Sequence, residues 1–173
     1  MRLYLIGMPG AGKTTLGRAL ATFYSVPFYD LDEEIVRREG RSIADIFAQE
    51  GEAYFREREA ATLRAVVAEH EKLVLATGGG TPCFHDNMEV LLDTGLALYL
   101  AVPVELLVQR LHRAAAARPL LAGLPDPEAL TTRLRETLAA REQFYNRAPL
   151  HCAATACSVE SIRRLVMHYQ TTG

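Results

Sequence analysis

The stretch Gly7-Met8-Pro9-Gly10-Ala11-Gly12-Lys13-Thr14-Thr15 follows directly on the apolar run of residues 3–6. It has the form G-x-x-x-x-G-K-[ST], in which glycines allow backbone N–H groups to surround a phosphate. A helix that begins at Lys13 adds the positive end of its dipole. The lysine suits the β- and γ-phosphates, and the Thr14 hydroxyl suits a magnesium ion. The stretch therefore predicts a nucleoside triphosphate site formed by Gly10, Ala11, Gly12, Lys13, Thr14 and Thr15.

Apolar runs and helical patterns alternate along the rest of the chain. Strand-like runs cover residues 3–6, 26–30, 73–76, 96–100 and 151–156. Helical patterns cover residues 13–24, 32–38, 42–51, 52–70, 103–112, 130–146 and 158–169. Strands separated by helices favour a parallel sheet covered on both faces, so we expect an α/β protein with three αβα layers and a five-stranded parallel sheet. Ligands of such a sheet lie at the carboxyl ends of the strands.

Local patterns within these elements lead to three further expectations. Leu16, Leu20 and Phe23 are spaced to form the inner face of the first helix. Asp32 stands where it can cap the helix of residues 32–38. The Ala- and Pro-rich segment of residues 114–127 is typical of a mobile loop.

The composition limits the classes of protein and partner. The chain has 173 residues, with 19 Lys and Arg against 21 Asp and Glu, so it is most simply one domain with a net charge of −2. This charge argues against nucleic acid binding, and no apolar run reaches the length of a membrane span. Cys83, Cys152 and Cys157 are an odd number in no metal-ligand spacing. We expect free thiols, no disulfide and a cytoplasmic protein.

Two large classes of phosphate-loop protein do not fit the sequence. A GTPase switch needs a D-x-x-G segment and an N-K-x-D segment, and the chain contains neither. An ATPase motor usually ends a buried strand in an aspartate. Here residues 73–76 lead into Thr-Gly-Gly-Gly, and residues 96–100 lead into Ala-Val-Pro. Elimination leaves a kinase that acts on a small substrate.

Two pairs of charged residues support an acceptor site. Asp30 and Asp32 lie two residues apart at a strand end, where one can serve a magnesium ion and the other can orient a hydroxyl. On the residues alone, helix capping is the favoured role of Asp32. Arg56 and Glu59 lie at i, i+3, so they can pair and hold a guanidinium ready for a carboxylate. A solvated charged face is the alternative for this pair.

An ordered series of motifs resembles the shikimate kinase family. After the phosphate loop come D-x-D at residues 30–32, Gly40-Arg41-Ser42-Ile43, Phe55-Arg56-Glu57-Arg58-Glu59 and Gly78-Gly79-Gly80. Arg118-Pro119-Leu120-Leu121 and Arg141-Glu142-Gln143-Phe144-Tyr145 complete the series, which spans about residues 3 to 147. The resemblance implies a P-loop fold of the nucleoside-monophosphate-kinase type in one domain of residues 1–173. It also implies an acceptor-binding segment at about residues 32–60 and a mobile lid at about residues 112–125.

The resemblance implies a role for each matched residue. Asp32 would bind the hydroxyls of shikimate and act as the base or the orienting group. Lys13 and Arg118 would stabilise the transferred phosphoryl group, and Arg118 would contact ATP from the lid. Asp30 would hold magnesium through water beside Thr14. The full shikimate-binding set would be Asp32, Arg56, Gly79, Gly80 and Arg141.

A member of this family would transfer the γ-phosphoryl group of MgATP to the 3-hydroxyl of shikimate, in the biosynthesis of chorismate and aromatic amino acids. We therefore expect magnesium as cofactor, ATP as co-substrate and shikimate as acceptor. We also expect a monomer that binds neither nucleic acid nor a membrane. A gluconate kinase and a non-catalytic nucleotide-binding relative remain the alternatives. Residues 156–158 offer no basic or amide side chain for adenine, which leaves Arg110 as the one candidate outside the phosphate loop.

Overall fold

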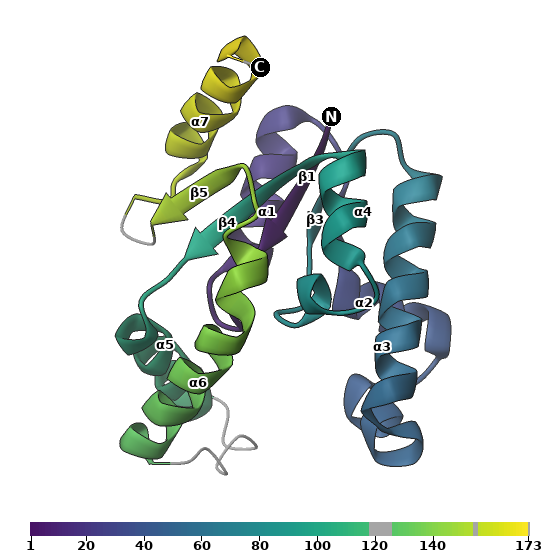
Figure 1. The fold of residues 1–173 in the computed structure, drawn as a ribbon, viewed down its shortest axis with the longest axis vertical. Helices are drawn as coiled ribbons and strands as arrows, with labels where there is room; N and C mark the ends of the chain where they lie inside the picture. The colour runs from purple at the N-terminus through teal and green to yellow at the C-terminus, as the bar shows by residue number, and fades with distance from the viewer. Residues whose placement is uncertain (118–125, 154–155, 173) are drawn as a thin grey trace.

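The sheet is the frame of the molecule, and the computed structural model describes residues 1–117, 126–153 and 156–172 around it. Five strands form one parallel sheet in the order β2-β3-β1-β4-β5 (Figure 1). They are β1 (Arg2–Ile6), β2 (Phe28–Asp30), β3 (Leu73–Ala76), β4 (Leu96–Ala101) and β5 (Leu150–Ala153). Residues 3–6 of β1 and all of β3 are buried, which is why both read as uninterrupted apolar runs.

Helices flank the sheet on both sides and confirm the predicted αβα architecture. They are α1 (Lys13–Tyr24), α2 (Leu31–Glu39), α3 (Ile43–Glu69), α4 (Asn87–Thr94), α5 (Val104–Ala117), α6 (Pro127–Tyr145) and α7 (Val159–Thr172), with a short 3-10 helix, η1 (Thr81–Cys83). The connection from β1 to β2 crosses the sheet in the opposite direction from the later connections. Right-handed crossovers therefore put α1 on one face, where it meets α7, and put α3 and α4 on the other.

The order of the strands on either side of β1 determines where a ligand can bind. The strand lies at the centre of the sheet, and the chain leaves it toward β2 on one side, while β4 lies on the other. Such a switch point opens a crevice at the carboxyl ends of the strands. In Figure 1, α2 and the first part of α3 lie on one side of these strand ends, and α5 and α6 lie on the other.

Several predicted boundaries are confirmed, and the exceptions have local causes. The helix of residues 13–24 and the strand of residues 73–76 begin and end as predicted. Phe23, however, is 49% exposed, because Tyr24 packs against the core at the last turn of α1 instead. The helices predicted on either side of Gly51 together make up α3, and the predicted break between them is confirmed, since Gly51 has a non-helical φ of 80° and ψ of 178°.

The segment predicted to be a mobile loop is partly helical. Within residues 114–127, α5 continues through Ala117, because alanine has the highest helix propensity. At the other end Pro127 begins α6, where its missing N–H costs nothing, and Asp126 caps the helix by accepting from two backbone N–H groups. The rest of the predicted lid, residues 118–125 with Arg118, lies outside the described residues. None of the described helices is both long and apolar enough to cross a membrane.

Candidate functional site

The phosphate loop connects β1 to α1 at the carboxyl edge of the sheet. Gly10 and Gly12 have φ of 81° and 96°, which is a conformation that favours glycine. Lys13 is only 8% exposed, and its ammonium donates to the backbone carbonyls of Gly7 at 2.8 Å and Met8 at 3.0 Å. Burial lowers the pKa of Lys13 to about 8, against the opposing effect of nearby Asp32. The lysine is thus held inside the loop as a desolvated cation.

Two side-chain oxygens lie together beside this loop. The Thr14 hydroxyl donates to Asp30 Oδ2 at 2.7 Å, and Asp30 Oδ1 accepts from the backbone N–H of Asp32 at 3.1 Å. Since β2 ends at Asp30 and α2 begins at Leu31, Asp30 is the cap of α2. The expectation that Asp32 caps this helix is therefore wrong. The hydroxyl and carboxylate are the hard oxygen donors that magnesium prefers.

Asp32 lies beside the loop and Gly78 as a carboxylate with an altered proton affinity. It is exposed on one side, but protein surrounds it elsewhere. Burial raises its pKa from 3.8 to about 6, and the negative charges of Asp30 and Glu59 add to the rise. Lys13 and Arg56 act in the opposite direction. A base with this pKa is largely ionised at neutral pH and can still take up a proton.

Arg56 and Glu59 form the ion pair that the sequence predicts. Arg56 Nη1 donates to Glu59 Oε2 at 2.9 Å, and the glutamate is 1% exposed. The Arg56 guanidinium also lies 4.2 Å from the centroid of the Phe84 ring. Burial of both partners excludes the alternative of a solvated charged face.

The glycine turn, Gly78–Gly80, brings these groups together because it has no side chains. A Cβ at Gly78 would lie 3.3 Å from Asp32 Oδ1, and one at Gly79 would lie 2.9 Å from Arg141 Nη1. A Cβ at Gly80 would lie only 2.7 Å from two nitrogens of Arg56. The turn therefore has a carboxylate against its first residue and a guanidinium against each of the other two. This arrangement suits an acceptor with one carboxylate and several hydroxyls.

Tyr145 fixes the turn and was given no role from the sequence. Its side chain is fully buried, and its hydroxyl donates to the carbonyl of Gly79. Burial raises the pKa of Tyr145, so the phenol stays protonated and remains a donor. The only sequence signal was its place at the end of the Arg141–Tyr145 motif.

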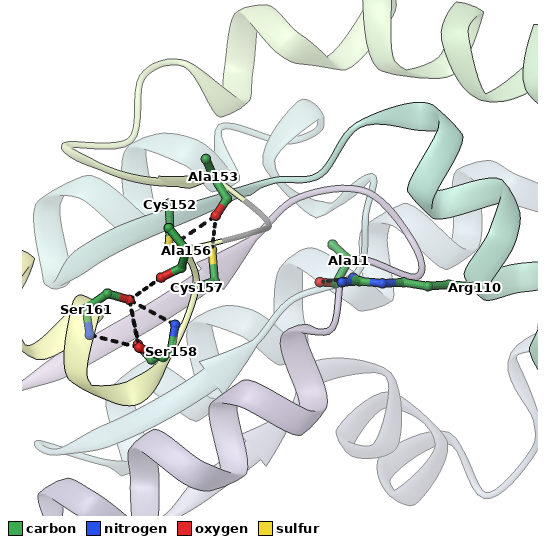
Figure 2. Close-up of a disulfide and its surroundings, with 8 residues drawn as sticks. All are labelled: Ala11, Arg110, Cys152, Ala153, Ala156, Cys157, Ser158 and Ser161. Carbon is green, nitrogen blue, oxygen red and sulfur yellow. Dashed lines mark hydrogen bonds between the residues drawn. A yellow bond between two sulfur atoms is a disulfide. The ribbon is translucent and has the colours of Figure 1, made fainter.

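A cavity lies beside the phosphate loop. It has a volume of about 440 Å³ and is lined by Gly10, Ala11, Gly12, Thr15, Leu16, Ala19, Leu100, Val102, Arg110 and Cys157. Arg110 reaches it from α5 and donates to the carbonyl of Gly10 at 3.2 Å. It also donates to the carbonyl of Ala11 at 3.0 Å (Figure 2). The cavity has the size and the position expected for an adenine base next to the phosphates.

Cys152 and Cys157 form a disulfide beside this cavity (Figure 2). The expectation of free thiols is wrong for this pair, and Cys83 alone is free. Cys152 is an inward-facing residue of β5, and its Cα atom lies 5.6 Å from the Cα atom of Cys157. That separation is within the range that a disulfide bridges. Composition could not reveal the pairing, because it depends on how close the fold brings these two residues.

Comparisons with known proteins agree on one family. The model of the shikimate kinase family matches residues 9–170. A shikimate kinase from Bacteroides thetaiotaomicron is 45% identical over 148 residues, covering 86% of this chain and 83% of the relative. One from Bacteroides fragilis is 40% identical over 174 residues and 96% of both chains.

Solved structures extend the agreement to the fold. The crystal structure of shikimate kinase from Bacteroides thetaiotaomicron has a TM-score of 0.87 at 38% identity, over 98% of both chains. Shikimate kinase from Acinetobacter baumannii in complex with shikimate has a TM-score of 0.82 at 36% identity, over 99% of this chain and 94% of the other. A gluconokinase from Sinorhizobium meliloti, at 15% identity and a TM-score of 0.55, shares the fold alone. The chain belongs to the shikimate kinase family.

Proposed function

We propose that the protein is an ATP-dependent kinase that transfers the γ-phosphoryl group of MgATP to the 3-hydroxyl of shikimate. The observation that carries the proposal is the glycine turn, against which Asp32, Arg56 and Arg141 all lie. The two guanidinium groups bind the acceptor carboxylate, and Asp32 binds its hydroxyls on the side toward the phosphate loop. Phosphoryl transfer needs mainly positioning and charge stabilisation, which such a rigid constellation supplies.

The nucleotide occupies the phosphate loop, with its base in the cavity beside Arg110. Lys13 exchanges the carbonyls of Gly7 and Met8 for the phosphate oxygens. Its pKa of about 8 leaves it mostly charged at neutral pH even before the phosphates arrive. Arg118 contacts the γ-phosphate in this proposal, and its contribution remains a prediction because it lies outside the described residues.

The residues beside the phosphate loop fit a magnesium ion. The Thr14 hydroxyl and the Asp30 carboxylate lie together at 2.7 Å, and they would hold the ion, Thr14 directly and Asp30 through water. Two protein groups are typical for magnesium, which keeps most of its waters and takes its other ligands from phosphates. Bound there, the ion would neutralise charge on the transferred phosphate.

Asp32 accepts or orients the proton of the attacking hydroxyl. Its carboxylate is ionised above about pH 6, and Lys13 lies close enough to stabilise that charge. Asp30 is less suited to this role, because its oxygens already accept from the Thr14 hydroxyl and from the backbone N–H of Asp32. Because Asp30 caps α2, Asp32 is the aspartate that acts on the hydroxyl, and Asp30 serves the magnesium ion.

The test is ADP release from MgATP with shikimate, with gluconate and with no acceptor, in one coupled assay. We expect release that depends on shikimate, because the turn holds the two arginines and Asp32 in fixed positions, which suit a carboxylate and hydroxyls on one rigid ring better than the flexible chain of gluconate. Release with gluconate alone would favour the sugar-acid kinase, and equal release without an acceptor would contradict the proposal. The expected monomeric state and cytoplasmic location remain predictions, checked by light scattering and by fractionation of the source cell.

A further inference from the structure

Thr81 lies directly after the glycine turn and is completely buried. Its hydroxyl donates to Glu59 Oε1 at 2.6 Å, while the other oxygen of this glutamate, Oε2, accepts from Arg56 Nη1 at 2.9 Å. One buried carboxylate thus joins Thr81 to an arginine of the acceptor site. An oxygen of a buried carboxylate that loses its donor is costly, so the hydroxyl strongly constrains the Glu59 rotamer.

Arg56 depends on Glu59 more than on its other acidic partner. Glu52 accepts from Arg56 Nε and Nη2 at 3.2 and 3.1 Å, but its side chain is 59% exposed. Exposed ion pairs of this kind contribute little to orientation, because solvent screens them. The guanidinium also packs so closely on Gly80 that even a Cβ there would meet it at 2.7 Å. A small rotation of Glu59 is therefore transmitted directly to Arg56.

Thr81 is itself held by a chain of hydrogen bonds that begins on α3. Its carbonyl accepts from Asn87 Nδ2 at 3.0 Å, and Asn87 Oδ1 accepts from Arg64 Nη1 at 2.8 Å. Asn87 is fully buried, and Arg64 also donates to the carbonyl of His85 at 2.7 Å. Glu59 and Arg64 lie on the same helix, so α3 holds both the hydroxyl and the backbone of Thr81. These contacts give the threonine a fixed position from which to orient Glu59.

We propose that Thr81 is a positioning residue for the acceptor carboxylate, whose hydroxyl fixes Glu59 so that Glu59 holds Arg56 against Gly80. The inference rests on the proposed function, in which Arg56 binds that carboxylate. Without the hydroxyl, Glu59 Oε1 turns toward Arg56 and draws the guanidinium away from its position over the turn. The loss falls on acceptor binding, because Thr81 makes no contact with the phosphate loop among the hydrogen bonds of the described residues.

The experiment measures KM for shikimate and for MgATP, together with kcat and Tm, in three variants. Thr81→Val keeps the volume and removes the hydroxyl, and we expect KM for shikimate to rise on the order of tenfold with KM for MgATP unchanged. Thr81→Ser keeps the hydroxyl and restores KM to within about twofold. Thr94→Val is the matched control, since the Thr94 hydroxyl bonds to Tyr4 and to the Val90 carbonyl near the start of β4, at the opposite end of the sheet. It lowers Tm and leaves both KM values unchanged.

The outcomes separate this inference from the proposed function. An active wild type with unchanged KM for shikimate in Thr81→Val overturns the role of Thr81 alone. Equal changes in Thr81→Val and Thr81→Ser, or a parallel rise in both KM values, also overturn it, since they indicate general damage. A wild type without shikimate-dependent turnover overturns the proposed function and this inference together. If Thr81→Val does not fold, Thr81→Ala is compared with Thr81→Ser in the same way.

Discussion

The raised pKa of Asp32 predicts an acidic limit to activity well above that of an ordinary aspartate. Replacing Glu59 by glutamine is the informative perturbation, because Glu59 is a fixed negative charge that raises the Asp32 pKa. The other charged groups that act on Asp32 are Asp30, which raises its pKa, and Lys13 and Arg56, which lower it. Glu59→Gln therefore removes one negative charge that repels the ionised form of Asp32. It also leaves the positive charge of Arg56 without its buried partner. Both effects lower the pKa of Asp32.

The magnitude follows from the pKa of about 6. At pH 5 about a tenth of Asp32 is ionised, so kcat/KM for shikimate falls about tenfold from its value at pH 7.5. The ordinary pKa of 3.8 would leave more than about nine tenths ionised and the rate nearly unchanged. In Glu59→Gln the acidic limb moves to lower pH, although the plateau falls because Arg56 is less well held.

Two assays measure this prediction. Carbon-13 NMR of labelled aspartate carboxyls follows Asp32 in the ligand-free protein, with its resonance assigned by Asp32→Asn. Steady-state kinetics at saturating MgATP gives the profile of kcat/KM for shikimate. The reasoning is refuted if Asp32 titrates near 4, or if its titration is the same in Glu59→Gln as in the wild type.

The same pKa has a consequence for stability. A carboxyl whose pKa is higher in the folded protein than in the unfolded chain favours folding below about pH 4, and this contribution is lost as the pH rises through about 6. For a fully buried group, the shift of the pKa from 3.8 to about 6 would lower the free energy of unfolding by about 3 kcal/mol at pH 7. Because solvent reaches one side of Asp32, we expect about 1–2 kcal/mol. The free energy of unfolding of Asp32→Asn, measured with urea, should exceed that of the wild type by this amount at pH 7 and should equal it at pH 3.5.

The remaining predictions concern the acceptor site and the disulfide. Asp32→Asn should abolish phosphoryl transfer and leave nucleotide affinity, measured by calorimetry, nearly unchanged; a normal kcat would remove Asp32 from the chemistry. Arg141→Ala should weaken shikimate binding by about 2–4 kcal/mol, seen as a raised KM, and an unchanged KM would mean that Arg141 does not bind the carboxylate. Gly79→Ala should raise the same KM, since its Cβ would meet Pro9 at 2.7 Å. Alkylation of the unfolded, unreduced protein should label Cys83 alone by mass spectrometry, and three labelled thiols would contradict the disulfide.

Features set by short-range patterns could be predicted from the sequence. The helix of residues 13–24 follows a glycine-rich loop and has a clear apolar stripe, and the strand of residues 73–76 is a buried apolar run. The Arg56–Glu59 pair follows from i, i+3 spacing on a helix. In each case the residues that decide the structure are neighbours in the sequence.

The choice between Asp30 and Asp32 required the structure. Both acids can cap a helix, and only the end of β2 at Asp30 decides that this residue takes the position. That boundary depends on pairing with β3, which places Asp30 opposite Ala76. The sequence does not show where this pairing ends, so it could not show that Asp30, and not Asp32, caps α2.

The structure of the segment after the glycine turn could not be predicted from the sequence pattern, for a similar reason. Residues 81–83 form η1 and residues 87–94 form α4, and neither element was predicted. His85 and Asp86 both have positive φ, and Arg64 holds the carbonyl of His85 from a distant helix. Contacts across 21 residues, rather than local periodicity, set this backbone. Thr81 therefore gave no signal in the sequence, although it contacts Glu59 directly.

The identity of the product tests the central claim most directly. Purified protein is incubated with MgATP and shikimate, and a phosphorus–proton NMR correlation locates the new phosphate on the acceptor. The account predicts one product, in which phosphorus couples to the proton on C3, because Asp32 and the two arginines fix the acceptor in one orientation. Phosphate on another oxygen, or no phosphorylated shikimate at all, would contradict it.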